Sequence, residues 1–363
     1  MPARHTLVLE ALYPVWDCEE DDRLICRAVY EETHDVKTFV FVSPEPRQFN
    51  FAPGQFLTFE FQIDGAAVNR CYTIASSPTR PHTVAITVKR IPQGTVSNWL
   101  HDNLRVGDVV RAVGPMGEFS TWAHPSPKRL FVSGGVGATP LISHVRRDFD
   151  VGEDLDTIYL HFARTPRDII FRTELELMAH RRLGLKVAHV VESVEGERSW
   201  SGYRGRFSPD LVSNIAPDFA EREIFCCGPP AFMAAVRYFF ESAGHEMRRY
   251  HEESFDFDAL SQAEREAAPP PPDETLATYE ITFTKSGRTV PCDENTTILA
   301  AARLAGMRLP ASCTKGLCGT CKTKMREGRV EMTHAGGIRQ REIDAGMVLL
   351  CCAKPRSDVV IER

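Results

Sequence analysis

Long apolar runs are missing from this sequence of 363 residues. No stretch approaches the roughly 18–20 apolar residues of a membrane-spanning helix. Residues 1–22 form an N-terminal extension with one short apolar patch followed by proline and acidic residues, unlike a secretory signal. The net charge is only −6, which argues against nucleic acid as the main partner. Because neither a membrane span nor a secretory signal is recognisable, we expect a cytoplasmic protein.

The sequence also lacks the usual patterns of hydrolytic sites. It shows no H-x-x-x-H spacing and no recognisable Ser-His-Asp or paired-carboxylate arrangement. Internal repeats are absent. Cysteine, in contrast, is present eleven times, an odd number, and is concentrated toward the C-terminus. A chain of this length does not need disulfides to be stable, so we expect the thiols to serve metal ligation or redox chemistry.

Three regions with different patterns follow one another, which predicts a multidomain protein. Residues 23–125 alternate apolar and polar positions in short runs broken by Pro and Gly, as in an antiparallel β-barrel. In residues 126–255 strand-like and helix-like segments alternate, which predicts an α/β domain with a parallel sheet. Residues 256–276 contain four consecutive prolines and form a semi-rigid linker. Residues 277–363 combine a strand pair, an amphipathic helix and a cysteine-rich loop.

Individual elements can be placed within these regions. In the first region we expect strands at 36–44, 54–62, 70–78, 82–90 and 107–115. In the second we expect strands at 129–135, 156–164, 185–193 and 223–229, and helices at 140–149, 172–181 and 230–244. In the last we expect a strand pair within 279–293 and a helix at 296–306.

Charge is distributed unevenly between these regions. Residues 277–363 carry 14 Lys and Arg against 9 Asp and Glu, a net charge of +5, so the rest of the chain carries −11. The C-terminal module is therefore basic, and the rest of the chain, which we call the body, is acidic. This contrast predicts that the module docks against acidic surfaces, both on its own chain and on an external partner.

The cysteine loop is the most specific signal. Cys313, Cys318 and Cys321 have the spacing C-x4-C-x2-C, with Gly316 and Gly319 between them. Three thiolates on a short loop, followed by a distant fourth, match the plant-type [2Fe–2S] spacing, and the glycines allow close approach of backbone amides. Structural zinc is the alternative, but zinc sites usually pair two C-x2–4-C units, and only one is present.

Several further motifs lie on strands of the first two regions or directly after them. They are RCYT at 70–73, TVKR at 87–90, QGTVSNWL at 93–100, SGGVGATP at 133–140 and CGPPAFM at 227–233. An arginine can neutralise a phosphate, a tyrosine can pack on an aromatic ring system, and a glycine-rich turn before a helix can approach a dinucleotide. Each motif alone is weak evidence, since an exposed aromatic strand, a common glycine turn or a buried cysteine would explain it.

Together these motifs resemble those of a known family. From about Tyr279 to the end the chain resembles a plant-type ferredoxin domain with a β-grasp (α+β) fold. The preceding ~250 residues resemble the ferredoxin–NADP reductase family of flavoproteins, with a flavin domain and a nicotinamide domain. This domain order is that of reductases that serve Rieske-type oxygenases and of the reductase for the hybrid-cluster protein.

The resemblance implies roles for residues around the flavin. Arg70 would neutralise a flavin phosphate, Tyr72 would pack on the isoalloxazine and Thr73 would meet the ring near N5 as a catalytic residue. Relatives that bind FMN carry a turn richer in Arg and Gly than residues 93–100, so we expect FAD. The family's flavin-binding positions correspond here to Arg70, Tyr72, Thr73, Thr87, Val88, Arg90, Gly94, Val96 and Ser97.

The resemblance also implies a nicotinamide site in which the catalytic Cys227 lies beside C4 of the ring. Asp168 disfavours the 2′-phosphate of NADPH, so we expect NADH, although Arg167 leaves NADPH open. The positions implied in dinucleotide binding are Gly134, Gly135, Gly137, Thr139, Pro140, Arg164, Asp168, Cys227, Gly228, Pro229 and Met233. In similar reductases a glutamate and an aromatic residue after the nicotinamide domain cover the flavin, and Glu253 and Phe255 are the candidates here. The alternative is that this segment is a solvated acidic linker.

The fourth cluster ligand is either Cys351 or Cys352. The segment GMVLLCC is expected to be a strand, where neighbouring side chains point to opposite faces, so only one of the two can reach the irons. Resemblance to the V-L-x-C-x-x-x-P segment of plant-type ferredoxins implies Cys351. The metal ligands expected are thus Cys313, Cys318, Cys321 and Cys351.

The implied function is electron transfer from NADH through FAD and a [2Fe–2S] cluster to a redox protein. The leading expectation is the reductase component of a Rieske-type monooxygenase, within which the chain resembles reductases for small quaternary amines such as glycine betaine. The alternative is the NADH oxidoreductase of the hybrid-cluster protein. A flavin-bearing sensor or flavohaemoglobin-like module is a further class, against which the lack of a haem-binding globin segment speaks.

Overall fold

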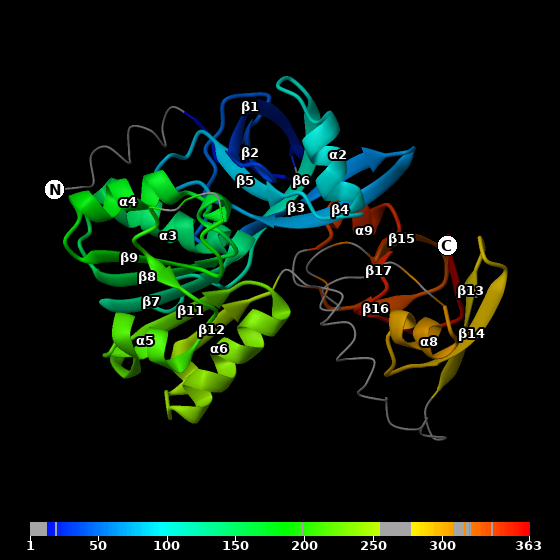
Figure 1. Ribbon diagram of the computed structural model, residues 1–363. Coiled ribbons are helices and arrows are strands. Elements are labelled where there is room, and N and C mark those ends of the chain that lie inside the picture. Colours follow the sequence, from blue (N-terminus) through cyan, green and yellow to red (C-terminus); the bar gives the residue numbers. More distant parts are fainter. Residues whose placement is uncertain are drawn as a thin grey trace.

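The computed structural model describes residues 13–254 except 19, 196 and 198, and residues 277–363 except 308, 310–315, 317–318, 320 and 335–336. Phe255, Cys313, Cys318 and the expected linker therefore lie outside the described residues. In the described part the chain forms three sheet-based units, which Figure 1 shows in blue to cyan, green, and yellow to red.

The first unit is a six-stranded antiparallel sheet in the order β4-β3-β6-β1-β2-β5. An isolated bridge between Ile74, just after β4, and Ile86 on β5 joins the two edges and closes the barrel. The predicted antiparallel β-barrel is thus confirmed. Its strands are β1 (Arg23–Thr33), β2 (Val36–Val42), β3 (Phe56–Ile63), β4 (Ala66–Thr73), β5 (Val84–Lys89) and β6 (Val109–Met116).

Alternate residues of these strands fill the barrel, as the period of a strand requires. Phe39 and Phe41 of β2 and Phe59 and Phe61 of β3 are fully buried in one core, and Trp16 packs into the same core. Helix α2 (Thr95–Asn103) follows β5 and was not predicted. It begins directly after Gly94, so the expected turn continues as a helix whose Leu100 is buried in the barrel core.

The second unit has an all-parallel sheet in the order β10-β9-β8-β7-β11-β12, which confirms the predicted α/β domain. One face packs on α3 and α4 and the other on α5 and α6, so both sides of the central strands are apolar. The strands are β7 (Lys128–Gly134), β8 (Asp156–Ala163), β9 (Leu185–Val191), β10 (Tyr203–Arg204), β11 (Glu223–Cys227) and β12 (Tyr250–Glu253). The helices are α3 (Ala138–Val151), α4 (Arg172–Arg181), α5 (Pro209–Ile215) and α6 (Pro230–Ser242).

The third unit is a mixed five-stranded sheet in the order β14-β13-β19-β15-β17, with a separate pair β16–β18. Helix α8 (Ile298–Leu304) packs into the same core as β13, β14 and β19, as expected for a β-grasp domain. The strands are β13 (Thr278–Phe283), β14 (Arg288–Asp293), β15 (Lys322–Glu327), β16 (Val330–Met332), β17 (Met347–Leu349), β18 (Ala353–Pro355) and β19 (Val359–Ile361), and the second helix is α9 (Gln340–Asp344).

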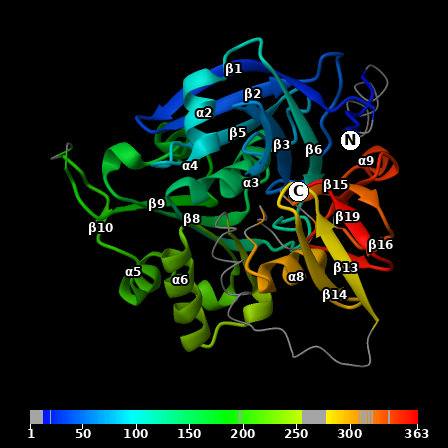
Figure 2. The ribbon, with the colours of Figure 1, turned by 90° about the vertical axis from the view of Figure 1, so that its right-hand side faces the viewer.

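The ferredoxin-like unit lies against the barrel. Figures 1 and 2 both show α9 and β15 beside the barrel sheet, near β4 in the first view and near β6 in the second. In the part of the chain that the structure describes, none of the helices has the length and apolarity needed to cross a membrane.

Candidate electron-transfer site

The end of the barrel strand β4 meets the end of β12 from the parallel-sheet unit. Thr73 Oγ1 donates a hydrogen bond of 3.1 Å to Glu253 Oε2, across 180 residues of sequence. The Glu253 carboxyl keeps some solvent access but is densely surrounded by protein, and this desolvation raises its pKa to about 8, against the opposing effect of the Thr73 hydrogen bond. Burial therefore favours the protonated form of Glu253, which is paired with the residue expected at flavin N5 and is not a solvated linker residue.

Two glycine-containing loops meet at the carboxyl ends of β7 and β11. A Cβ on Gly137 would lie 2.1 Å from the Cys227 carbonyl oxygen, and Cβ atoms on Gly134 and Gly228 would lie 3.1 and 2.7 Å from the Phe232 ring. At Gly137 the contact is with backbone, so only a residue without a side chain allows this approach. The Cys227 thiol is fully buried, and burial raises its pKa well above the usual range, so it is a neutral thiol.

Other predicted dinucleotide residues shape this region. Thr139 donates its hydroxyl to the Val136 carbonyl at 3.0 Å, and the neighbouring Pro140 is buried at the start of α3. Pro229 is the N-cap residue of α6, and Met233 is buried in the core beneath that helix. Gly135 adopts a positive φ of 53° in the single turn that precedes α3.

Asp168 lies just beyond the end of β8, in a turn that it caps. Its Oδ2 accepts hydrogen bonds from the Thr165 amide at 3.0 Å and the Thr165 hydroxyl at 2.7 Å, while Oδ1 lies 3.2 Å from Arg164 Nη2. Asp35, from the turn between β1 and β2, lies 3.5 Å from the same guanidinium and 2.9 Å from Lys89 Nζ. Sequence reasoning missed Asp35, because it comes from another unit and carries no motif.

The residues predicted to form the flavin-binding turn, and those on the strand before it, also make contacts within the protein. Ser97 Oγ accepts the Ile91 amide at 3.1 Å, and a Cβ on Gly94 would lie 2.6 Å from that hydroxyl. Arg90 pairs with Asp102, with Nη1 3.1 Å from Oδ2. The Thr87 hydroxyl lies 2.7 Å from that of Thr38, and Val88 and Val96 belong to the barrel core. These contacts fix the turn, and direct contacts of its residues with a flavin remain predictions.

On β4 itself, Arg70 donates from Nη1 to the Asn69 carbonyl at 2.8 Å. The Tyr72 ring packs edge-on against Phe59 and Phe61, with centroids 6.2 and 6.4 Å apart, and burial raises the pKa of its hydroxyl. β4 therefore carries a cation at Arg70, an aromatic ring at Tyr72 and a hydroxyl at Thr73 within four residues. This donor set fits the phosphate, ring and N5 of a flavin.

The cluster loop is described only in part. Cys321 and Cys351 are buried, and the Gly316 amide donates to Cys351 Sγ at 3.3 Å. Buried sulfur atoms that accept backbone amides fit a thiolate-ligated iron–sulfur cluster, because such hydrogen bonds stabilise the charge on the sulfur.

One expectation at the fourth ligand is wrong. β17 ends at Leu349, and residues 350–352 form a turn closed by the Cys352 amide on the Leu349 carbonyl at 3.2 Å. The alternation of a strand therefore does not separate the two thiols. A Cβ on Gly316 would lie 2.9 Å from Cys352 Sγ, so Cys352 also lies beside this loop. Cys351 remains the predicted ligand, now supported by its amide hydrogen bond.

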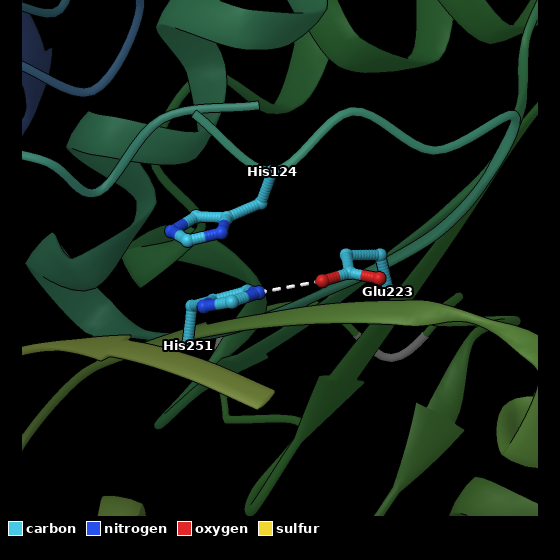
Figure 3. Close-up of side chains that lie close together, drawn as sticks. All are labelled: His124, Glu223 and His251. Atoms are coloured by element: carbon cyan, nitrogen blue, oxygen red, sulfur yellow. Dashed lines mark hydrogen bonds and ion pairs between the residues drawn. The ribbon is translucent and has the colours of Figure 1, made fainter. Parts of the chain in front are cut away.

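A histidine pair lies apart from these sites, where the connection between the barrel and the parallel sheet meets β12. His124 and His251 stack with centroids 3.6 Å apart and an angle of 16°, and His251 Nε2 lies 2.6 Å from Glu223 Oε1 (Figure 3). Their donor atoms lie within 4.8 Å of one another. In a face-to-face stack the lone pairs run side by side and do not converge on one ion. Arg249 Nε, 3.2 Å from Glu223 Oε2, adds positive charge. We read the group as a contact that fastens the barrel-to-sheet connection to β12.

The fold and site define a flavin- and iron–sulfur-dependent oxidoreductase with three modules in one chain. Family models agree: an oxidoreductase FAD-binding domain matches residues 25–121, an oxidoreductase NAD-binding domain matches residues 131–238, and a 2Fe-2S iron-sulfur cluster binding domain matches residues 281–356.

Curated relatives share the whole arrangement. The chain is 43% identical to the glycine betaine monooxygenase reductase subunit of Pseudomonas aeruginosa, over 93% of this chain and 94% of that one. It is also 43% identical to the stachydrine N-demethylase reductase subunit of Rhizobium meliloti, over 93% and 96%. A ferredoxin reductase component of 3-ketosteroid-9-alpha-monooxygenase from Rhodococcus rhodochrous is 32% identical over 92% and 94%. The chain therefore belongs to the family of ferredoxin–NADP-reductase-like flavoproteins with a C-terminal ferredoxin domain.

The fold has a solved counterpart of the same extent. Phthalate dioxygenase reductase matches 96% of this chain and 100% of its own, with a TM-score of 0.55 and 24% identity. This likeness concerns the fold alone, and it agrees with the order of the three units described above.

Proposed function

We propose that this chain is the reductase component of a Rieske-type monooxygenase that demethylates a small quaternary amine such as glycine betaine. The observation that carries the proposal is the 43% identity to glycine betaine and stachydrine reductase subunits over 93% of the chain. The relatives named above are reductase components that work with oxygenase components. Nothing in the three modules themselves selects the amine substrate, which belongs to the oxygenase.

When bound, FAD would accept two electrons as hydride from NADH and pass them one at a time to the [2Fe–2S] cluster. The protein's part is to position the groups and to handle protons. Arg70 and Tyr72 would hold the phosphate and ring of FAD. The loops at Gly137 and Cys227 would place the nicotinamide, with the neutral Cys227 thiol adding no charge beside C4. The Thr73–Glu253 pair holds a proton where flavin N5 would lie.

The choice of NADH over NADPH is part of the proposal. Asp168 is fixed by its cap, and Asp35 adds a second carboxylate near Arg164. Both pair with the guanidinium of Arg164, which leaves that cation less available to a 2′-phosphate, and the acidic Asp168 itself disfavours this group. Steady-state rates with each donor and ferricyanide as acceptor test this choice. Equal or better kcat/KM with NADPH would contradict it.

The acceptor is tested by reconstitution. Purified reductase, a glycine betaine oxygenase component and NADH should together release formaldehyde from glycine betaine, and omission of the reductase should abolish product. A Cys351→Ser reductase serves as a control for electron delivery through the cluster. If NADH oxidation proceeds but no product forms with the oxygenase from the same source organism, the proposed acceptor is wrong.

A further inference from the structure

Two contacts join the ferredoxin domain to the barrel, and the barrel residues that make them, Asp22 and Asn69, belong to no cofactor motif. One is an ionic group around Asp22, at the start of the barrel. The other is a hydrogen bond from Asn69, the residue before the Arg70 expected at the flavin phosphate. The contacts connect residues 317 and 250 positions apart in sequence, so they are features of domain docking.

The ionic group places one carboxylate among three arginines. Asp22 Oδ1 lies 2.8 Å from Arg111 Nη1 within the barrel. Its Oδ2 contacts the guanidinium of Arg339 and lies 2.9 Å from Arg341 Nη2, both from the ferredoxin domain at the start of α9. The side chains of Asp22 and Arg339 are only 3% and 5% exposed.

Burial decides the strength of this group. A salt bridge exposed to water contributes little, whereas a buried charge that loses its partner is strongly unfavourable. Undocking would separate Asp22 from Arg339 and Arg341 and expose these charges to water, where Asp22 would keep Arg111 as a partner and Arg339 would keep Glu342 at 3.6 Å. Docking adds the attraction of two ferredoxin-domain arginines for one barrel carboxylate, in accord with the +5 ferredoxin domain on the −11 body. Removal of the Asp22 charge in the docked state would leave Arg339 buried without its main counter-charge.

The second contact is made at the cluster loop itself. Asn69 Nδ2 donates to the Gly319 carbonyl at 3.1 Å. Gly319 lies between Cys318 and Cys321 in sequence, and Asn69 lies on β4 with Arg70, Tyr72 and Thr73. The strand that would hold the flavin thus directly touches the loop that would hold the cluster.

We propose that Asp22, Arg339 and Arg341 form an ionic latch that docks the ferredoxin domain in the position where its cluster receives electrons from the flavin, with Asn69 as a positioning residue for the cluster loop. In each transfer one electron leaves the reduced flavin and reduces the oxidised cluster. The inference rests on the electron-transfer role of these two domains and is independent of which oxygenase accepts the electrons.

The test uses the holoenzyme and two variants, Asp22→Asn and Asn69→Ala. After anaerobic mixing with NADH, flavin bleaching should keep its wild-type rate. Cluster reduction should slow by at least about tenfold in Asp22→Asn, because loss of one partner of a buried charge pair typically weakens docking by more than that factor. Small-angle X-ray scattering of the same variant should show a larger radius of gyration, a readout that does not depend on activity.

Matched controls are available beside each residue. Asp21 carries the same charge next to Asp22 but pairs with Arg23 at 2.8 Å, so Asp21→Asn should behave as wild type. Gln62 is exposed on the neighbouring strand β3, so Gln62→Ala is the control for Asn69→Ala. If Asp22→Asn does not fold, the partly exposed Asn69 decides the test, and its variant should slow cluster reduction with flavin bleaching unchanged.

A double variant tests the latch as a unit. Asp22→Asn combined with Arg341→Gln should slow cluster reduction no more than Asp22→Asn alone, because Arg341→Gln removes a contact that Asp22→Asn has already removed. Wild-type cluster reduction with unchanged scattering in Asp22→Asn and Asn69→Ala would overturn the proposal. Equal slowing of flavin bleaching, or an equal effect of Asp21→Asn, would also overturn it. No oxygenase is needed, so these outcomes leave the proposed acceptor untouched.

Discussion

Substitution of Gly137 by alanine tests how closely the loop after β7, which contains Gly137, must approach the loop after β11, which begins at Cys227. The added Cβ would lie 2.1 Å from the Cys227 carbonyl oxygen, 2.4 Å from its carbon and 2.7 Å from the Gly228 nitrogen. All three atoms are backbone, so no side chain can turn away. The loops must part by about 0.9 Å merely to bring the closest contact to 3.0 Å. Such overpacking typically lowers stability by about 1–3 kcal/mol.

The same displacement moves Cys227 relative to the place predicted for the nicotinamide. A shift of about 1 Å in an active site can lower a rate roughly 100-fold. Anaerobic stopped-flow measurement of flavin reduction against NADH concentration should therefore show a drop of about 10- to 100-fold in the limiting rate for Gly137→Ala.

Gly244, after α6 in the same domain and outside every cofactor motif, provides the control. Its φ is 72°, but a Cβ there would meet no atom within 4 Å, so Gly244→Ala carries a backbone cost of about 1–2 kcal/mol without moving Cys227. Its limiting rate should stay near wild type. A Gly137→Ala protein that reduces its flavin at the wild-type rate with wild-type NADH affinity would refute the steric requirement, as would equal impairment of Gly244→Ala.

Three further predictions follow from the site. Burial raises the pKa of Glu253 from its ordinary value near 4.5 to about 8. Between these two pH values the folded state retains a proton that the unfolded chain releases, so the stability of the protein should fall as pH rises through this window. Glu253→Gln should flatten the dependence of melting temperature on pH, and an unchanged slope would show that Glu253 is not the titrating group. Cys227→Ala should slow hydride transfer while FAD stays bound, as read from flavin bleaching and flavin content; an unchanged rate would reduce Cys227 to a packing residue. Cys351→Ser should lose iron and the visible bands of the cluster while Cys352→Ser keeps them, and the reverse result would assign the fourth ligand to Cys352.

Much of the fold could be predicted from local patterns. Period-two alternation in segments such as VKTFVFV and the strand-to-glycine-to-helix order around Gly134 depend only on neighbouring residues, and β2, β7 and α3 lie where the sequence indicates. Helix α2 was missed because QGTVSNWL combines a glycine turn with a short apolar face, and the turn was the stronger signal. The strand expected through Cys351 ends at Leu349 because the chain turns there toward the cluster loop.

The contacts that complete the site could not be predicted in this way. Thr73 meets Glu253 across 180 residues, Arg164 meets Asp35 across 129, and Arg339 meets Asp22 across 317. Glu253 was expected near the flavin from the resemblance, but its pairing with Thr73 was not, and Asp35 and Asp22 belong to no motif. Each acidic partner is brought into place by the docking of one unit on another. Motifs therefore indicated the cofactors and a candidate acid near the flavin, whereas the pairing of that acid and the domain-docking residues required the three-dimensional arrangement.

Electron transfer through the three modules is tested by the order in which flavin and cluster are reduced after anaerobic mixing with NADH. Flavin reduction is followed by absorbance, and cluster reduction by electron paramagnetic resonance of samples frozen at successive times. Flavin bleaching should come first and the signal of the reduced [2Fe–2S] cluster should follow, with Cys351→Ser showing the first phase only. A cluster that stays oxidised while the flavin turns over, or one that is reduced before the flavin, would contradict electron transfer from NADH through the flavin to the ferredoxin domain.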